Sequence, residues 1–442
     1  MKALLRKLWD SMGGSLWLVP AAMLLMAIVV ASVTIWLERA EYLSVPEGFR
    51  WVFGGGCEGA RAVLSTIAGS MITVAGVTFS IMMVVLTLAS SQFGPRLLRN
   101  FMRDKVNQAV LGMFGATFVY CLLVLRAIHG PDAVVFVPQV SVNIGMLLAI
   151  FSLAFLTYFI HHVSVTIQPA WVMASVCAEC DHVFDRLFPE EAEEMSKEPE
   201  PSPEEREALQ RFDTEAYSIK AKASGYVQSV DHEMLMSLAE EADVILRQLH
   251  RPGDYVIAGV PLLLVHPSAN VSEQLVPRAQ RAFLFGKNRV PLDDPEFAIN
   301  ELVEIAVRAL SPGVNDPFTA IACIDHLSTR LATLARRRFP CPFRYDEDGV
   351  LRIIADVCTF AGALDAAYNQ IRQYAAPNVA VLLRMMEAIG MVGKLVRRPS
   401  DRDALLHHAG MIHAAGCEAI PEARDRNDLE ERYEAVRKIL EA

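Results

Sequence analysis

Cys177 and Cys180 form a C-x-x-C pair with His182 shortly behind, and thiol and imidazole groups are preferred zinc ligands. The pair could also act as a redox dithiol. A lone C-x-x-C pair is equally compatible with two small side chains packed on one face of a helix. Because no second pair follows, we expect packing, and we predict no metal site and no cofactor.

Motifs that carry catalysis are missing from the sequence. There is no G-x-S-x-G, H-E-x-x-H or kinase-like set, and Gly54-Gly55-Gly56 lacks the lysine and hydroxyl of a phosphate-binding loop. We therefore predict no catalytic residue and expect the protein not to be an enzyme. An enzyme would need a polar pocket assembled by the fold from groups such as Asp316, Asp325 and His326.

Small and hydroxyl side chains recur at intervals of three, four and seven along one apolar segment, which places them on one face of a helix. They are Gly69, Thr73, Gly76, Ser80, Thr87 and Ser91, and we call them the small-residue stripe. We expect the stripe not to face lipid. Close helix packing, within the chain or in a homo-oligomer, would use it, and so would a water-filled permeation path.

The stripe ends at a predicted hinge formed by Gln92, Phe93, Gly94, Pro95 and Arg96. Proline lacks the amide hydrogen that a continuing helix needs, and glycine readily leaves the helical conformation. The sequence therefore predicts a helix break that joins the apolar segment to a basic one.

Four apolar segments are long enough to cross a membrane, since about 20 apolar residues span the ~30 Å hydrocarbon core. The segment from Ala62 to Pro95 runs thirty-four residues without a charge, and the others are Leu16–Leu37, Gln108–Leu125 and Val140–Ile160. We predict an α-helical membrane domain of four transmembrane helices over residues 1–165.

Basic residues set the expected orientation. They precede the first segment and fill the connection between the second and third, at Lys2, Arg6, Lys7, Arg96, Arg99, Arg103 and Lys105. Because cytoplasmic loops carry such an excess, we expect both termini of a multi-pass membrane protein in the cytoplasm.

Residues 166–214 are predicted to form an amphipathic helix and an acidic linker. The stretch Glu190–Glu207 holds nine carboxylates against Lys197 and Arg206, so it supplies seven of the ten net negative charges of the chain. Such a segment is typical of a solvated linker, and the overall acidity says little about partners. No basic aromatic stripe occurs, and we expect no nucleic acid partner.

Short β segments follow, and the cytoplasmic region is predicted to be α+β. Over residues 215–270, an SGYV strand, a PGDYV turn and a GVPLLLV strand resemble the two halves of a barrel-sandwich fold, with a helical insert at Asp231–His250. Carrier domains of that fold attach a cofactor to a lysine, but no lysine lies between Lys222 and Lys287. We predict a small barrel-sandwich-like module without a carrier function.

Residues 271–442 are predicted to be mainly helical, with a β hairpin at Phe343–Ile354. Helix starts carry Asp or Asn caps, and Asn427 with Glu430 resembles a capping box. A joint between two helices contains Ser311, Gly313, Asn315 and Asp316. These residues suit a helix-turn-helix connection, and the alternative is a loop that binds an ion, a ligand or a neighbouring subunit.

Several stretches together resemble the bacterial membrane-protein family called Domain of Unknown Function 2254. They are Thr87–Arg96, Ser224–Val227, Leu249–Val256, Leu302–Ala320 and Asn369–Tyr374. The resemblance implies a multi-pass inner-membrane protein with a cytoplasmic domain, and it assigns no functional residue. Our leading hypothesis is a gated channel or transport-related protein with a cytoplasmic sensing domain. The alternative is a non-conducting scaffold or signalling protein whose cytoplasmic domain docks a partner or ligand.

Overall fold

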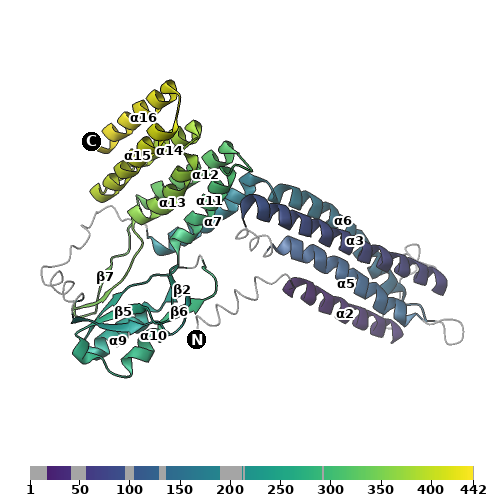
Figure 1. The fold of residues 1–442 in the computed structure, drawn as a ribbon. Coiled ribbons are helices and arrows are strands. Elements are labelled where there is room, and N and C mark those ends of the chain that lie inside the picture. The colour runs from purple at the N-terminus through teal and green to yellow at the C-terminus, as the bar shows by residue number, and fades with distance from the viewer. Residues whose placement is uncertain are drawn as a thin grey trace. The chain divides into compact units, whose positions relative to one another are not determined.

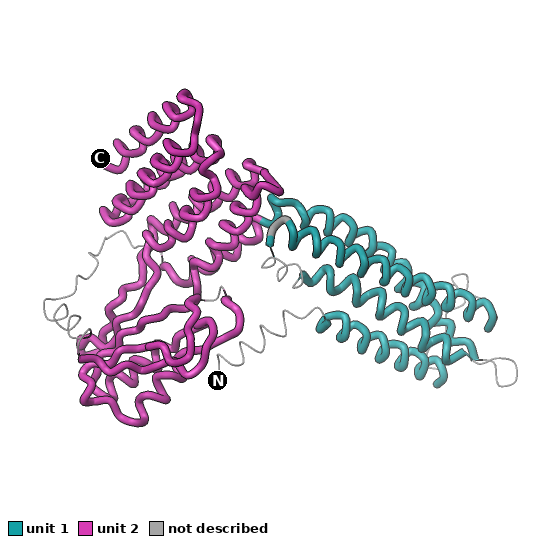
Figure 2. The backbone as a smooth tube through the Cα atoms, in the orientation of Figure 1, with its two compact units in different colours: residues 1–172 teal, residues 173–442 magenta. Residues whose placement is uncertain are grey.

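The structure of the chain is a computed structural model that describes residues 17–40, 56–94, 104–128, 136–189, 212, 215–290 and 293–441. The predicted acidic linker lies outside these residues, as do Pro95 and Arg96 of the predicted hinge. The chain divides into two compact units, residues 1–172 and residues 173–442 (Figure 2). Each unit is described by itself.

The described part of the first unit contains four long helices (Figure 1), namely α2 (Leu18–Arg39), α3 (Cys57–Phe93), α5 (Lys105–Ala127) and α6 (Gln139–Thr166). Among the described residues these four are long and apolar enough to cross a membrane, which confirms the four predicted apolar helices. With 37 residues, α3 is the longest. At 1.5 Å per residue it extends about 55 Å, well beyond a ~30 Å hydrocarbon core.

Helix α5 is the centre of this unit and packs against α2, α3 and α6. Small residues allow the close approach: a Cβ added at Gly112 would lie 2.6 Å from the Sδ atom of Met23 on α2. Buried polar groups bond to one another, as Thr117 and Ser152 do with 3.0 Å between their hydroxyl oxygens. Lipid tails are as apolar as the helix side chains, so the hydrophobic effect does not drive helices together in a membrane. Helices there associate through close packing and hydrogen bonds of this kind.

Carboxylates stabilise two helix starts in this unit. The side chain of Glu38 accepts hydrogen bonds from the backbone amides of Val140 (2.7 Å) and Ser141 (3.1 Å) at the beginning of α6. Asp104 accepts from the amide of Val106 (2.8 Å) at the start of α5 and also lies 2.5 Å from Nε2 of His162. Negative groups are favoured at helix N-termini by the helix dipole.

The second unit contains two sheets. The five-stranded sheet has the order β1 (Tyr217–Lys220), β5 (Pro261–His266), β3 (Ile245–Gln248), β8 (Leu351–Ile354) and β7 (Phe343–Tyr345), and the three-stranded sheet has the order β4 (Tyr255–Val256), β2 (Gly225–Val230) and β6 (Phe283–Gly286). Among the strands of the described residues, only β3 and β8 pair in parallel. Helices α9 (His232–Ala242) and α10 (Leu275–Arg281) and the short 3-10 helix η2 (Ser268–Asn270) accompany the sheets. One apolar core joins both sheets, α9 and α10.

The barrel-sandwich expectation is not confirmed. Strand β3 lies inside the stretch predicted to be a helical insert, and β6, β7 and β8 come from residues beyond 270. The predicted hairpin at Phe343–Ile354 is present as β7 and β8. The pairing of β3 with β8 joins residues about a hundred positions apart, and a non-local pairing of this kind leaves no turn signal between its strands.

The rest of the second unit is a stack of helices (Figure 1). It is formed by α7 (Pro169–Leu187) from Met173 onward, and by α11 (Pro295–Ala309), α12 (Pro317–Leu334), α13 (Phe360–Ala375), α14 (Val379–Gly393), α15 (Pro399–Ala419) and α16 (Ala423–Glu441). Side chains cap several starts as the sequence predicts, including Asp316 on α12 and Asn378 on α14. The predicted capping box at Asn427 is wrong, because α16 already begins at Ala423.

Candidate functional site: a charged pocket in the second unit

A pocket of about 260 Å³ lies in the second unit, between the start of α11, the end of α7 and the β region. We call it the charged pocket. Its lining residues are Leu187, Phe188, Val230, His232, Arg251, Pro252, Asp293, Asp294, Pro295, Glu296, Pro340, Arg344, Asp356, Val357 and Cys358. Convergent polar groups in a concave site are typical of small-molecule binding.

One wall of the pocket is the turn before β4, which contains Arg251, Pro252 and Gly253. The amide of Gly253 donates to the carbonyl of Val227 on β2 (2.9 Å), and the amide of Val227 donates to the carbonyl of Asp254 (2.9 Å). Gly253 has a φ of 102°, a conformation that favours glycine. The turn is therefore held against β2 and fixes the backbone from which Arg251 extends.

The start of α11 forms the second wall. Asp294 caps this helix, because its Oδ1 accepts the amide hydrogen of Phe297 (3.0 Å), and it also pairs with Arg289. The Asp294 side chain is only 3% exposed. A Cβ added at Gly253 would lie 2.7 Å from Cγ of Asp294, so the glycine lets the two walls meet.

Three carboxylates of the pocket have arginine partners. Glu296 is 2.6 Å from Arg251, Asp293 is 3.4 Å from Arg186, and Asp294 pairs with Arg289. Burial raises the pKa of Glu296 although Arg251 opposes the shift. These pairs neutralise most of the charge in the pocket, since buried charges are costly without partners.

Arg344 and Asp356 remain without a partner. Among the described residues neither side chain makes a hydrogen bond or an ion pair. Burial lowers the pKa of Arg344 and raises the pKa of Asp356, which means that each charged form lacks full compensation. The pocket therefore presents one cation and one acid that make no hydrogen bond or ion pair with the described residues, although the nearby Arg251 partly offsets the charge of Asp356.

His232 and Cys358 complete the polar lining. Burial lowers the pKa of His232, and the nearby charge of Arg344 lowers it further, so the imidazole is neutral at pH 7. Its Nε2 lies 3.1 Å from Oε1 of Gln248, whose Nε2 donates to the carbonyl of His250, so His232 Nε2 is the donor and Nδ1 is left as an acceptor. Burial raises the pKa of the Cys358 thiol to about 12, which keeps it protonated and weakly nucleophilic.

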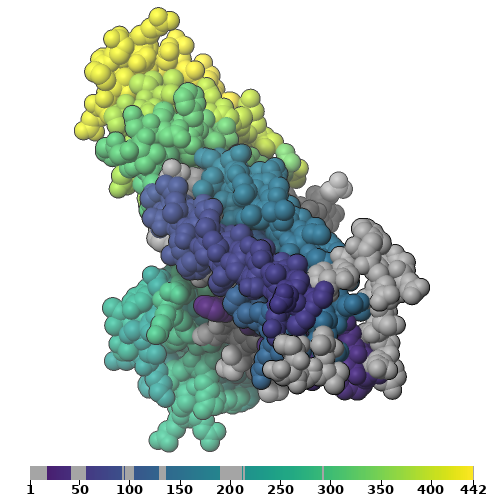
Figure 3. Space-filling model, turned by 90° about the vertical axis from the view of Figure 1, so that its right-hand side faces the viewer, coloured from purple at the N-terminus to yellow at the C-terminus, as the bar shows by residue number. Residues whose placement is uncertain are grey.

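The small-residue stripe lies elsewhere, in the first unit. All six of its residues are exposed on α3, outside the contacts between the four helices, and α3 appears in indigo at the surface in Figure 3. The hydroxyls bond to carbonyls of their own helix, as Thr73 does to Gly69 and Ser80 to Gly76, both at 2.9 Å. A Cβ at Gly69 or Gly76 would meet open space. The four described helices therefore leave this face uncovered.

At the end of the stripe, α3 stops at Phe93. Gly94 follows with a φ of 101°, and its amide donates to the carbonyl of Ser90 at 3.2 Å. The helix break thus falls where Gly94 was expected to end it. The hinge role of Gln92 to Arg96 stays a prediction.

The helix joint is built from local hydrogen bonds. Asp316 caps α12 through Oδ1, which accepts the amide of Thr319 (3.1 Å), while Oδ2 accepts its hydroxyl (2.6 Å). Asn315 has a φ of 49°, and its amide donates to the carbonyl of Ser311 at 2.9 Å. Neither these residues nor Gly313 line the charged pocket. Their proposed role in binding stays a prediction, and connecting α11 to α12 accounts for the contacts they make.

Cys177 and Cys180 are buried on α7, whereas His182 is exposed. Burial raises the pKa of both thiols. Neighbouring Met173 lies against α12, with 3.5 Å from its Sδ to Sγ of Cys323. The two cysteines are buried while His182 is exposed, and among the described residues the three do not form a group of converging ligand atoms. Helix packing is compatible with both cysteines.

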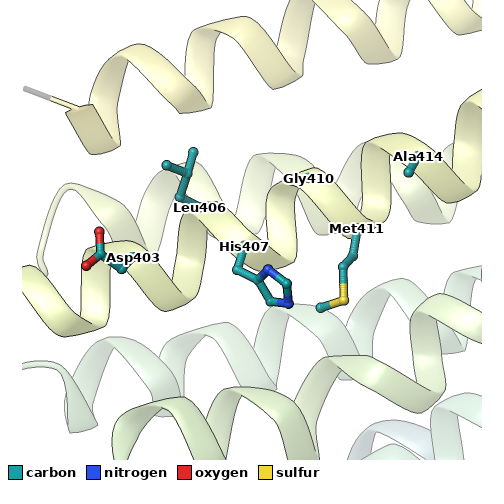
Figure 4. A pocket seen from close by; sticks show the side chains of 6 residues that line it. All are labelled: Asp403, Leu406, His407, Gly410, Met411 and Ala414. Atoms are coloured by element: carbon teal, nitrogen blue, oxygen red, sulfur yellow. The ribbon is translucent and has the colours of Figure 1, made fainter.

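A further hollow on α15 is lined by Asp403, Leu406, His407, Gly410, Met411 and Ala414. Figure 4 shows that all six residues come from this one helix. Groups from different elements do not converge there as they do in the charged pocket. We therefore take the hollow as an open helix face.

Comparison with known proteins supplies the family. A family model described as a predicted membrane protein (DUF2254) matches residues 13–391. The chain belongs to this family. Uncharacterised proteins of Mycobacterium bovis and Mycobacterium tuberculosis are each 34% identical to it over 382 residues, which is 85% of this chain and 71% of each relative. No solved structure matches the chain.

The charged pocket of this DUF2254 protein was not predicted from the sequence. Two sequence features included residues of the pocket without indicating a site. Arg251 and Pro252 lie in a stretch by which the chain resembles the family, and Arg344 lies in the predicted hairpin. Asp325 and His326, considered as enzyme groups, lie outside the pocket, and Asp325 is 2.5 Å from Arg384. The pocket lining lies within the matched residues 13–391, whereas α15 and α16 lie beyond them.

Proposed function

We propose that this predicted membrane protein is a ligand-responsive protein whose charged pocket binds a small molecule that carries a carboxylate or phosphate group. The observation that carries the proposal is Arg344, a half-buried guanidinium in the pocket without a carboxylate partner among the described residues. Guanidinium groups bind carboxylate and phosphate in a bidentate manner. The volume of about 260 Å³ is below that of most drug-sized sites, which suits a small metabolite.

The same ligand would carry a hydrogen-bond donor or a positive group. Asp356 and Nδ1 of His232 offer acceptors that no described residue uses, and an amino or amide group would satisfy them. A binding role is favoured over thiol catalysis because the one cysteine of the pocket holds its proton. We infer from the basic connections of the membrane helices that the pocket faces the cytoplasm of a bacterial cell.

The test is a thermal-shift screen of small anions and zwitterions on the full-length protein in detergent. A ligand at a hundred times its Kd should stabilise the protein by about 2.7 kcal/mol. Arg344→Gln should weaken binding at least tenfold. The matched control is Arg278→Gln, which changes an exposed arginine paired with Glu241 outside the pocket. No saturable hit, or equal binding by the Arg344 variant, would overturn the proposal.

A second candidate function is conduction or homo-oligomeric assembly through α3. It is favoured by the exposed small-residue stripe, because small residues let helices of neighbouring copies approach closely and hydroxyls can line a water path. The ligand pocket would then serve as the sensing part of a gated channel. Without conduction, the same arrangement would describe a signalling scaffold.

Recording from lipid vesicles separates these outcomes. We expect discrete openings in the unaltered protein and their loss in Gly76→Leu, which places a bulky side chain on the stripe. Ile81→Phe is the control, because Ile81 is exposed on α3 but lies about 100° around the helix from Ser80, away from the stripe. A silent bilayer with inserted protein would remove conduction, and unchanged assembly of the Gly76 variant would remove the stripe as a contact.

A further inference from the structure

Three metal-ligating side chains converge at the last two helices of the second unit. His413 and Cys417 lie one turn apart on α15, and Glu430 reaches them from α16. Their ligand atoms all lie within 4.8 Å of one another. This is the one such group among the residues that the structure describes. It is independent of the charged pocket, which none of the three residues lines.

The distances suit a four-coordinate ion. Bond lengths of ~2.0–2.3 Å around tetrahedral zinc place ligand atoms roughly 3.3–3.8 Å apart. Sγ of Cys417 lies 3.3 Å from Nε2 of His413, close to this range. Oε2 of Glu430 lies 2.5 Å from the same nitrogen, as in a hydrogen bond, and would retreat by roughly 1 Å to admit the ion. Its side chain is 52% exposed and has room to do so.

The surroundings hold the ligands in place. The ring of His413 stacks on Tyr433 of α16, with 4.5 Å between centroids and 13° between planes. Gly416 is buried beside the site, and any side chain there would clash with Leu429, so this glycine lets α16 approach α15. A histidine and a cysteine at i and i+4 lie on the same helix face.

We propose that His413, Cys417 and Glu430 form a zinc-binding site with water as the fourth ligand. The thiolate and imidazole favour zinc over magnesium or calcium, which prefer all-oxygen sites. On binding, Cys417 releases its proton to solvent, and the proton on Nε2 of His413 is exchanged through solvent so that the neutral ring carries its hydrogen on Nδ1. The zinc ion then takes the place of the Nε2 proton between His413 and Glu430. The exposed Cys417 and Glu430 leave the fourth position open to water or to a ligand from outside.

A zinc ion at this site would link α15 to α16, because His413 and Cys417 lie on α15 and Glu430 lies on α16. We call this link the clip. Helix α16 packs on α14 and α15 and buries Leu429, Val436 and Leu440 among its described residues, and a zinc ion would add a further link from α16 to α15. A bound ion would therefore slow the local opening of α16. In the clip, the exposed thiol of Cys417 serves as a zinc ligand.

The experiment uses the full-length protein, purified in detergent without a polyhistidine tag and stripped of metal with a chelator. Zinc is titrated against a chromophoric competitor, and cobalt is added in a parallel sample because a thiolate ligand gives a charge-transfer band. We expect one ion per chain with a Kd in the micromolar range or below, and a cobalt-thiolate band. Amide exchange in α16 should slow at least severalfold when zinc is present.

Variants assign the ligands. Cys417→Ser and His413→Ala should weaken zinc binding at least tenfold, and Cys417→Ser should lose the cobalt band. Cys341→Ser and His407→Ala are matched controls, a half-buried cysteine outside the site and an exposed histidine on α15, and should bind zinc as the unaltered protein does. Circular dichroism verifies that each variant is folded. Absence of zinc binding to the unaltered protein would overturn the proposal. Equal zinc binding by the Cys417 and His413 variants would mean an adventitious ion only and would overturn it as well.

Discussion

Replacing Gly253 by alanine tests the central packing contact of the charged pocket. Gly253 has a φ of 102°, and a Cβ there would lie 2.7 Å from Cγ of the buried Asp294. An alanine in this backbone region costs about 1–3 kcal/mol by itself. Displacing Asp294 also disturbs its pair with Arg289 and its cap on α11. Breaking a buried pair outright costs about 3–5 kcal/mol and losing a cap about 1 kcal/mol.

Gly259 supplies the matched control. It has a φ of 92°, but a Cβ there would meet nothing within 4 Å. Gly259→Ala therefore carries the backbone strain without the clash. Because Asp294 would be displaced and not removed, we expect Gly253→Ala to destabilise the protein by about 2–4 kcal/mol more than Gly259→Ala. That difference corresponds to roughly 4–16 °C in Tm for a unit of this size.

The assay is thermal unfolding of the full-length variants in detergent at one heating rate. A third variant combines Gly253→Ala with Asp294→Ala, and the excess cost of the first change should shrink when the side chain it strikes is absent. Equal Tm values for Gly253→Ala and Gly259→Ala would refute the reasoning, because the walls of the pocket would then not meet at Asp294.

Three other outcomes are expected. Tyr368→Phe removes a buried hydroxyl 2.9 Å from Oγ of Ser328 and should lower the stability measured by thermal unfolding by about 1 kcal/mol; no change in Tm would contradict this bond. Burial lowers the pKa of His408, so its neutral form is favoured in the folded state. Its contribution is therefore complete above the unfolded value of ~6.5 and is lost as the pH falls below it, so Tm should drop less between pH 7.5 and pH 5.5 in His408→Gln than in the unaltered protein. In metal-free protein at pH 7.5, an alkylating reagent should modify the exposed Cys417 and spare Cys358, whose pKa burial raises to about 12; peptide mass spectrometry that finds Cys358 labelled would contradict the burial.

The helices of this chain could be predicted because their signals are local. Long apolar runs predict α2, α3, α5 and α6, and side chains at helical spacing with Asp or Asn caps predict most helices of the second unit. Strand β3 was missed for a physical reason: four residues between a helix and a turn become a strand only by pairing with β5 and β8.

The sites could not be predicted in the same way. The charged pocket joins side chains from positions as distant as His232 and Asp356, and only the fold brings them together. Glu430 was interpreted as part of a capping box because Asn427 precedes it by three positions. In the structure α16 begins earlier, at Ala423, and Glu430 contacts His413 on the preceding helix. A local pattern thus concealed a contact between helices.

The parallel pairing of β3 with β8 decides the order in which the second unit can form during synthesis. Leu246 pairs with Ile353, so the ribosome must add more than a hundred residues after β3 before its partner exists. Until then β3 is an open edge of the sheet, and an open edge is prone to pair with other chains. The exposed edge of β3 must therefore be kept from pairing with other chains while the residues between 248 and 351 are synthesised. A chain truncated between these residues should be degraded or aggregate, because its sheet cannot be completed.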